Sequence, residues 1–153
     1  MPNYKGHLAG GAAAYLIGLY VLSFLQPTLP TALEWLLCTL AGSLFPDVDT
    51  KSKGQKLFYR ILTVVAIVLI FQQKFKPLLI IGSCAIIPII VDHRGLFHML
   101  WFVIGAPLIF VAVLSLSFPA YKDILFTDAF FFIAGAVSHL LLDFGVRRTL
   151  RMR

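Results

Sequence analysis

The chain has 153 residues, of which 59% are hydrophobic, 14% aromatic and only 13% charged, and its mean hydropathy is +0.90. A soluble domain carries about 25% charged and about 45–50% apolar residues. So few charged side chains cannot cover the surface of a water-soluble protein, which excludes a soluble enzyme, a disordered tail and a secreted disulfide scaffold. The composition predicts an integral membrane protein, and the length allows one domain over residues 1–153.

Apolar runs in chain order predict an all-α, polytopic membrane protein. A helix needs about 20 residues to cross the hydrocarbon layer, so the chain holds at most six crossings. Two runs are long enough to span alone, 8–25 and 96–118, and the run 124–144 is nearly as clear. The run 32–45 is short and is closed by Pro46, which lacks a backbone donor. The runs 61–73 and 77–91 are marginal, and form either two short tilted spans or a re-entrant hairpin. We therefore expect about five to six transmembrane or re-entrant helices in one bundle.

The basic residues predict the orientation of this bundle. Cytoplasmic segments of membrane proteins carry an excess of Lys and Arg. With the N-terminus inside, the inner segments hold most of the basic residues: Lys5, Lys51, Lys53, Lys56, Arg60, Arg94, Arg147, Arg148, Arg151 and Arg153. The outer loops keep Lys74, Lys76 and Lys122. Both termini are predicted to be cytoplasmic, whether 61–91 spans twice or turns back. The terminal arginines are expected to contact anionic lipid heads, so no nucleic-acid partner is expected.

Residues that can ligate metal ions fall into four short clusters. They are His7; Asp47 and Asp49; His93, Arg94 and His98; and His139 and Asp143. In the predicted topology each cluster lies at the cytoplasmic end of its helix, although histidines and acids were not used to assign that topology. Cys38 and Cys84 lie inside apolar runs and are interpreted as reduced packing residues.

The local spacing within the clusters suits metal binding. His139 and Asp143 are four residues apart, so a helix presents both on one face. Ionisable groups in a membrane are costly and indicate function, and a metal ion would neutralise the carboxylates. Six or seven mixed nitrogen and oxygen ligands fit one octahedral ion or two ions that share a carboxylate. Zinc is the first expectation, with manganese or iron as alternatives. Without a metal, the same residues would be interfacial polar groups, a solvated turn and an interhelical hydrogen-bonded pair.

At these residues the sequence resembles the YdjM-like family of predicted membrane-bound metal-dependent hydrolases. The resemblance runs from His7 to Asp143 and includes Phe-Pro-Asp-Val-Asp at 45–49, His-Arg-Gly-x-x-His at 93–98 and Ser-His-x-x-x-Asp at 138–143. It implies a small helical membrane protein with a metal site and hydrolase activity, here in a prokaryotic inner (cytoplasmic) membrane.

The leading functional prediction is a metal-dependent hydrolase at the cytoplasmic face. The predicted metal ligands are His7, Asp47, Asp49, His98, His139 and Asp143. His93 is either a further ligand or the general base, and Arg94 is expected to bind the substrate anion. A site level with the lipid heads favours an amphiphilic substrate, a phosphoester before an amide or carboxyl ester. The alternatives are a metal or proton transporter, or a structural metal site in a membrane scaffold. The sequence does not indicate the oligomeric state.

Overall fold

The computed structural model describes residues 3–49, 53–71, 73 and 96–149, and these residues form helices without any strand. The α-helices are α1 (Tyr4–Val21), α2 (Leu29–Leu44), α3 (Lys53–Phe71), α5 (Leu100–Ser117) and α6 (Lys122–Thr149). Short 3₁₀ turns lie at η1 (Ser23–Leu25), η2 (Phe45–Asp49), η3 (Leu96–His98) and η4 (Pro119–Tyr121). The all-α prediction is confirmed for this part of the chain, whereas the run 77–91 and Cys84 lie outside it.

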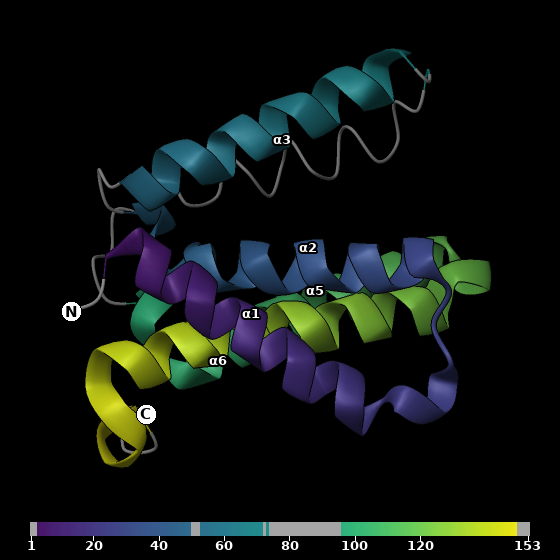
Figure 1. Cartoon of the computed structure of the whole chain (residues 1–153). Helices are drawn as coiled ribbons and strands as arrows, with labels where there is room; N and C mark the ends of the chain where they lie inside the picture. Colours follow the sequence, from purple (N-terminus) through teal and green to yellow (C-terminus); the bar gives the residue numbers. More distant parts are fainter. Residues whose placement is uncertain (1–2, 50–52, 72, 74–95, 150–153) are drawn as a thin grey trace.

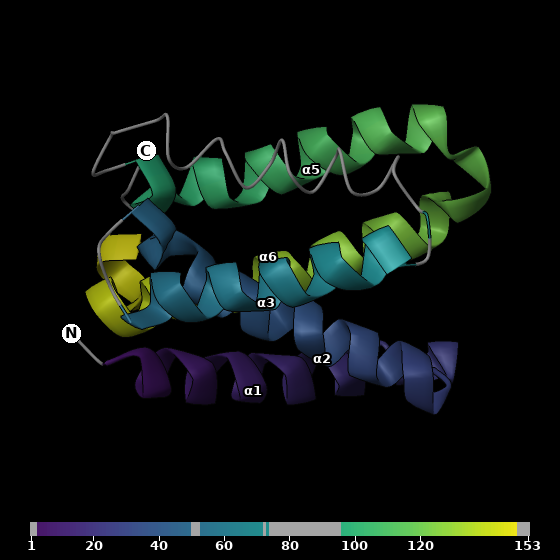
Figure 2. The same ribbon diagram turned by 90° about the horizontal axis from the view of Figure 1, so that it is seen from above.

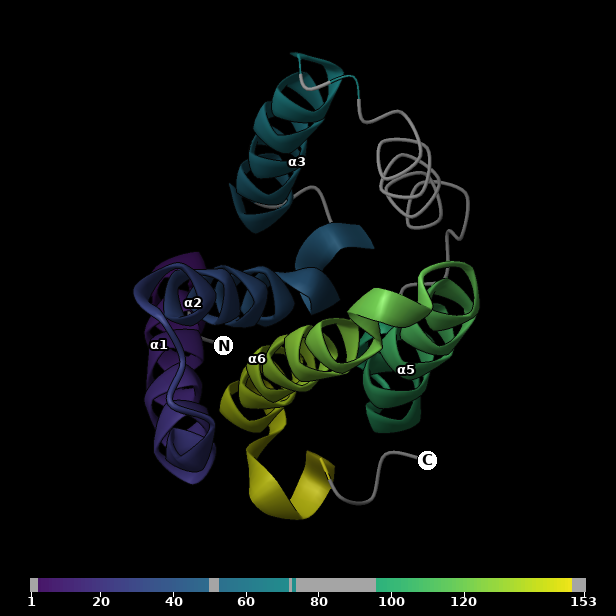
Figure 3. The same cartoon turned by 90° about the vertical axis from the view of Figure 1, so that its right-hand side faces the viewer.

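The described helices run in two opposite directions between the two ends of the molecule (Figure 1). Helices α1, α3 and α5 begin at the end that holds His7, which we call the histidine end, and α2 and α6 run back toward it (Figures 1 and 2). Helix α6 packs against α1, α2 and α5, while α3 contacts the others mainly through η2 (Figure 3). This arrangement gathers four sequence-distant segments at the histidine end.

Two helices of the described part are long and apolar enough to cross a membrane, over Leu100–Ser117 and Pro119–Gly145. Helix α2 has 16 residues, fewer than the about 20 that a perpendicular span needs. The count of five to six membrane helices is therefore supported for two of them and stays a prediction for the others. Large apolar side chains on α1 and α2 are nevertheless exposed, among them Ile17 at 65% and Leu37 at 63%.

Two expected helix boundaries are wrong. The apolar run 8–25 is not one helix, because α1 ends at Val21 and Gln26 takes a left-handed conformation with φ 45°. The run 96–118 is also divided: Leu96–His98 forms η3, and α5 begins at Leu100. His98 therefore lies in a tight turn before α5 and takes no part in the regular hydrogen bonds of that helix.

Helices α2 and α6 run parallel and nearly touch through two glycines. A β-carbon on Gly42 would collide with the carbonyl oxygen of Phe132, and one on Gly135 with that of Thr39. Beside this contact, the ring of Trp35 stacks on that of Phe131 with centroids 4.7 Å apart. The close approach fixes the position of α6 along the axis of α2.

Helix α6 changes direction at Gly145, where φ is 71° and ψ is 163° (Figure 1). A side chain strains this left-handed backbone, whereas glycine adopts it without cost. The hydroxyl of Thr149 then donates to the carbonyl oxygens of Leu140 and Gly145, at 3.1 and 2.9 Å. The straight part of α6 thus ends two residues after Asp143, at the histidine end.

Candidate metal centre

Five of the predicted ligands meet at the histidine end from four separate elements. His7 comes from the first turns of α1, Asp47 from η2, His98 from η3, and His139 and Asp143 from α6. Asp47 follows Pro46 in the 3₁₀ turn η2, directly after α2. These five side chains therefore lie together at one end of the bundle.

His139 is completely buried, and its orientation is set by the backbone of α2. Its Nδ1 lies 2.8 Å from the carbonyl oxygen of Ser43. Because a carbonyl oxygen can only accept, Nδ1 carries a proton and donates this hydrogen bond. In the neutral ring Nε2 is then unprotonated, and its lone pair points into the cluster.

Two carboxylates face this lone pair. Nε2 of His139 lies 3.2 Å from Oδ2 of Asp143 and 3.7 Å from Oδ1 of Asp47. Nε2 of His98 lies 3.8 Å from the same oxygen of Asp47 and 3.9 Å from the same oxygen of Asp143. Two imidazole nitrogens and two carboxylate oxygens therefore surround one small volume.

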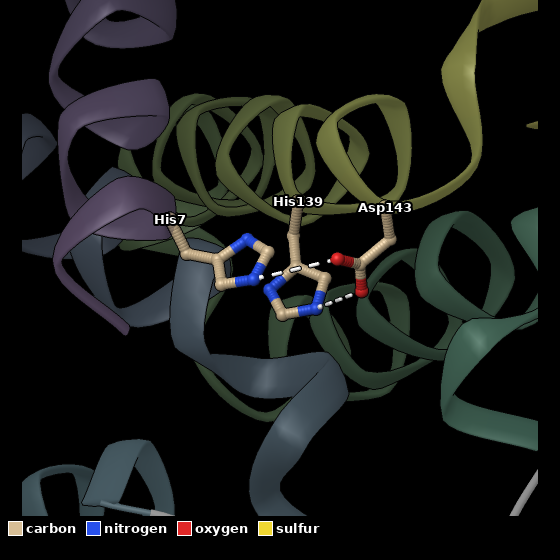
Figure 4. Close-up of side chains that lie close together, drawn as sticks. All are labelled: His7, His139 and Asp143. Atoms are coloured by element: carbon tan, nitrogen blue, oxygen red, sulfur yellow. Dashed lines mark ion pairs between the residues drawn. The ribbon is translucent and has the colours of Figure 1, made fainter. Parts of the chain in front are cut away.

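His7 reaches the cluster from α1 and lies beside His139, on the same side of Asp143 (Figure 4). Its Nε2 lies 3.5 Å from Oδ1 of Asp143, the oxygen that does not face His139. The rings of His7 and His139 also stack, with centroids 3.7 Å apart and an interplanar angle of 13°. His7 thus contacts two side chains of α6: it stacks on the ring of His139 and pairs with the carboxylate of Asp143.

Burial changes across the cluster. The side chains of His139, His7 and Asp143 are 0%, 3% and 4% exposed, whereas those of His98 and Asp47 are 20% and 25% exposed. Solvent therefore reaches the cluster on the side formed by η2 and η3. The opposite side is closed by the helices.

Several buried polar atoms of the cluster have no hydrogen-bond partner in the described part of the chain. They are Nδ1 of His7, Nε2 of His139 and Oδ1 of Asp143. Buried polar atoms are paired in most proteins, so an unpaired set points to a missing proton or ion. Two groups have their ligand atoms within 4.8 Å of one another and could hold a metal ion: His7, His139 and Asp143, and Asp47, His98 and His139.

Three predicted site residues remain untested by this geometry. His93 and Arg94 lie outside the described residues, and so does the side chain of Asp49, whose backbone ends η2. Sequence reasoning missed the role of the Ser43 carbonyl. No sequence signal could have found it, because every residue has a carbonyl group and only the packing of α2 on α6 selects this one.

A comparison with known proteins was made for the whole chain. No curated protein and no solved structure matched it. A family model described as "YdjM inner membrane protein" matches residues 1–151, which include all the clusters described above. The chain belongs to the YdjM family of inner membrane proteins.

Proposed function

We propose that the cluster at the histidine end holds a divalent metal ion and that the protein is a membrane-embedded hydrolase. The observation that carries the proposal is the position of Nε2 of His139, which lies 3.2 Å from a carboxylate oxygen of Asp143 and 3.7 Å from one of Asp47. An unprotonated imidazole nitrogen and two carboxylate oxygens this close together repel one another unless a proton or a metal ion lies between them. A metal ion would supply a positive charge there and would satisfy the unpaired Nε2 atom.

The separations between the ligand atoms support this assignment. Zinc bonds to nitrogen and oxygen at about 2.0–2.1 Å, so two ligands of a tetrahedral ion lie about 3.3–3.4 Å apart. The four nitrogen-to-oxygen separations that join His98 and His139 to Asp47 and Asp143 run from 3.2 to 3.9 Å. All ligand atoms lie within 4.8 Å of one another in two groups of three that share His139, one with His7 and Asp143 and one with Asp47 and His98. A small contraction around a bound ion would bring the four separations to tetrahedral values. We therefore assign these four side chains as ligands.

His7 lies outside this set of four. It contacts the second oxygen of Asp143 at 3.5 Å and stacks on His139, so it would orient two ligands. Such outer partners hold ligands in place and raise their basicity. The arrangement favours one ion with four ligands over the alternative of two ions sharing a carboxylate.

The exposed side of the cluster is where hydrolysis would take place. A divalent ion that takes a water as a further ligand beside these side chains would lower the pKa of that water and polarise a phosphoryl or carbonyl oxygen. Asp47 and His98 line the side open to solvent, so water and substrate would enter past them. His93, as a further ligand or the general base, and Arg94, as the residue that binds the substrate anion, stay predictions, because both lie outside the described residues.

The position of the cluster favours an amphiphilic substrate. Its residues lie where α5 begins and where α6 turns at Gly145, at the ends of the two helices able to cross the membrane. A substrate anchored by an apolar tail would present its polar group at this level. We propose a phosphoester of a lipid or related amphiphile, before an amide or carboxyl ester, with the cluster and both termini on the cytoplasmic side.

A structural metal site is the second candidate. Structural zinc sites are closed by four protein ligands, whereas catalytic ones have three ligands and a water. The two histidines and two aspartates would supply the four protein ligands of such a closed site. Cobalt substitution distinguishes the candidates, because an open site gains a water ligand and changes its absorption spectrum when a small anion binds. A closed site does not respond to the anion.

The test of the proposal is the metal content of the purified protein, measured by elemental mass spectrometry. We expect about one equivalent of a transition metal in the wild type and none in the Asp47→Ala, His139→Ala double variant. Asp123→Ala is the matched control, because Asp123 is exposed at the far end of α6. Negligible metal in all three proteins after reconstitution with zinc, manganese and iron would refute the metal site. If the wild type holds metal, release of phosphate from lipid phosphoesters by the wild type and not by the double variant would support the hydrolase.

A further inference from the structure

Helix α3 carries a hollow that the metal cluster does not use. It has a volume of about 520 Å³ and is lined by Gln55, Lys56, Tyr59, Arg60, Thr63 and Val64. All six residues lie between positions 55 and 64 of α3, which begins at the histidine end (Figure 1). Five of the six side chains can form hydrogen bonds, so the lining suits a polar ligand.

The charge in the hollow comes from two cations. Lys56 and Arg60 are exposed, lie one helical turn apart and form no ion pair within the described ranges. A rise of about 6 Å over four residues lets both reach the oxygens of one phosphate group. The hydroxyl of Thr63 already donates to the carbonyl of Tyr59, at 2.8 Å. The hollow therefore offers two positive charges for an anion.

An apolar stripe continues from the hollow along the same face of α3. Val64, Ile67, Ile70 and Phe71 follow at helical spacing and are 60%, 47%, 51% and 84% exposed. Residues spaced by three and four positions share one face of a helix. A polar hollow with two cations, followed by an exposed apolar stripe, matches a molecule with an anionic head and a hydrocarbon tail.

We propose that this face of α3 binds a phosphate-bearing anionic membrane lipid, with its headgroup between Lys56 and Arg60 and its acyl chain along the stripe. The membrane location of the family favours a lipid over a soluble phosphate, and so does the apolar continuation of the site. A soluble anion has no hydrocarbon part that would contact the exposed Ile67 and Phe71.

The lipid site is joined to the metal cluster through one side chain. Nε2 of Gln55 donates to the carbonyl oxygen of Val48, at 2.8 Å, and Val48 follows Asp47. The headgroup would thus be held beside the segment that carries a proposed metal ligand. Identification of this lipid as the substrate rests on the proposed function, whereas its binding to α3 does not.

Native mass spectrometry of the detergent-solubilised full chain tests the proposal, with phosphatidylglycerol, phosphatidylcholine and inorganic phosphate as probes. We expect the wild type to prefer phosphatidylglycerol. The Lys56→Gln, Arg60→Gln variant should bind it about 30-fold more weakly, from the usual contribution of two basic residues near a membrane surface. The matched control is Lys5→Gln, Lys53→Gln, which removes two exposed charges at the same end but outside the hollow.

Three results would overturn the lipid site: equal loss of binding in both double variants, no preference for the anionic lipid, or complete competition by millimolar inorganic phosphate. The Asp47→Ala, His139→Ala variant separates the two proposals, because it should lose metal and keep the lipid. A wild type without metal that still binds phosphatidylglycerol through Lys56 and Arg60 would refute the metal site and leave the lipid site standing.

Discussion

One hydrogen bond determines which ring nitrogen of His139 carries the proton. The carbonyl of Ser43 accepts from Nδ1 at 2.8 Å, and the unprotonated Nε2 then faces Asp143 and Asp47. The spacing of His139 and Asp143 in the sequence predicted that both lie on one face of a helix, and they do. The tautomer and the stacked His7 ring depend on how three helices pack, which no local spacing encodes.

Asp143→Asn tests whether the cluster is built for a cation. Without metal, the variant should be more stable than the wild type, because an amide removes one buried charge and can donate to Nε2 of His139 across the present 3.2 Å. A new hydrogen bond of about 1 kcal/mol corresponds to a rise of about 2–4 °C in the unfolding midpoint. Added zinc should stabilise only the wild type, by about 2.7 kcal/mol at one hundred times its Kd.

Thermal unfolding in detergent, with and without chelator, measures both effects. Asp123→Asn is the control, because this exposed side chain lies at the other end of α6 and should change neither midpoint. A metal-free Asp143→Asn variant less stable than the wild type would contradict the argument that the carboxylates repel one another.

His7→Ala tests the place of His7 outside the set of four ligands. Because His7 meets the proposed ligands at the second oxygen of Asp143 and at the face of the His139 ring, its loss should weaken metal affinity about 10–100-fold without abolishing binding. His139→Ala should abolish it. Titration against a chromophoric chelator measures both affinities. Equal effects of the two substitutions would make His7 a ligand of the ion.

At the scale of elements, the contact of α2 with α6 aligns the cluster. Gly42 and Gly135 let the two backbones approach, and this approach brings the Ser43 carbonyl to His139. The apolar runs predicted that both helices exist and where the motifs lie on them. The predicted topology also implies that the two helices run in the same direction. It could not predict that these two helices touch, because many helix pairings bury equally apolar faces.

Gly135→Ala tests this alignment. The added methyl group would meet the backbone of Thr39, which cannot move aside as a side chain can, so α6 must shift. We expect a loss of about 1–3 kcal/mol in stability together with weaker metal binding. Gly105→Ala is the matched control, because a methyl group there meets nothing within 4 Å. Thermal unfolding and metal titration of both variants provide the comparison, and unchanged metal affinity in Gly135→Ala would contradict the role of the contact.

At the scale of the whole molecule, composition predicted a helical membrane protein but not the length of each span. Helix α2 is short because Pro46 ends it, and the run 8–25 is broken at Val21. The charge distribution is clearer: among the described helices, Lys5, Lys53, Lys56 and Arg60 lie near the histidine end, whereas Lys122 lies near the opposite end. This asymmetry favours a cytoplasmic histidine end.

Reporter fusions test that orientation. Green fluorescent protein fused after Arg153 should fluoresce, because it folds in the cytoplasm, whereas alkaline phosphatase at the same position should be inactive. Alkaline phosphatase inserted at η4 should be active, because Pro119–Tyr121 connects α5 to α6 at the opposite end and Tyr121 is 58% exposed. The reverse pattern would place the histidines and aspartates on the outer face. The metal ion and the lipid headgroup would then come from the outer side of the membrane. The substrate would no longer come from the cytoplasmic leaflet.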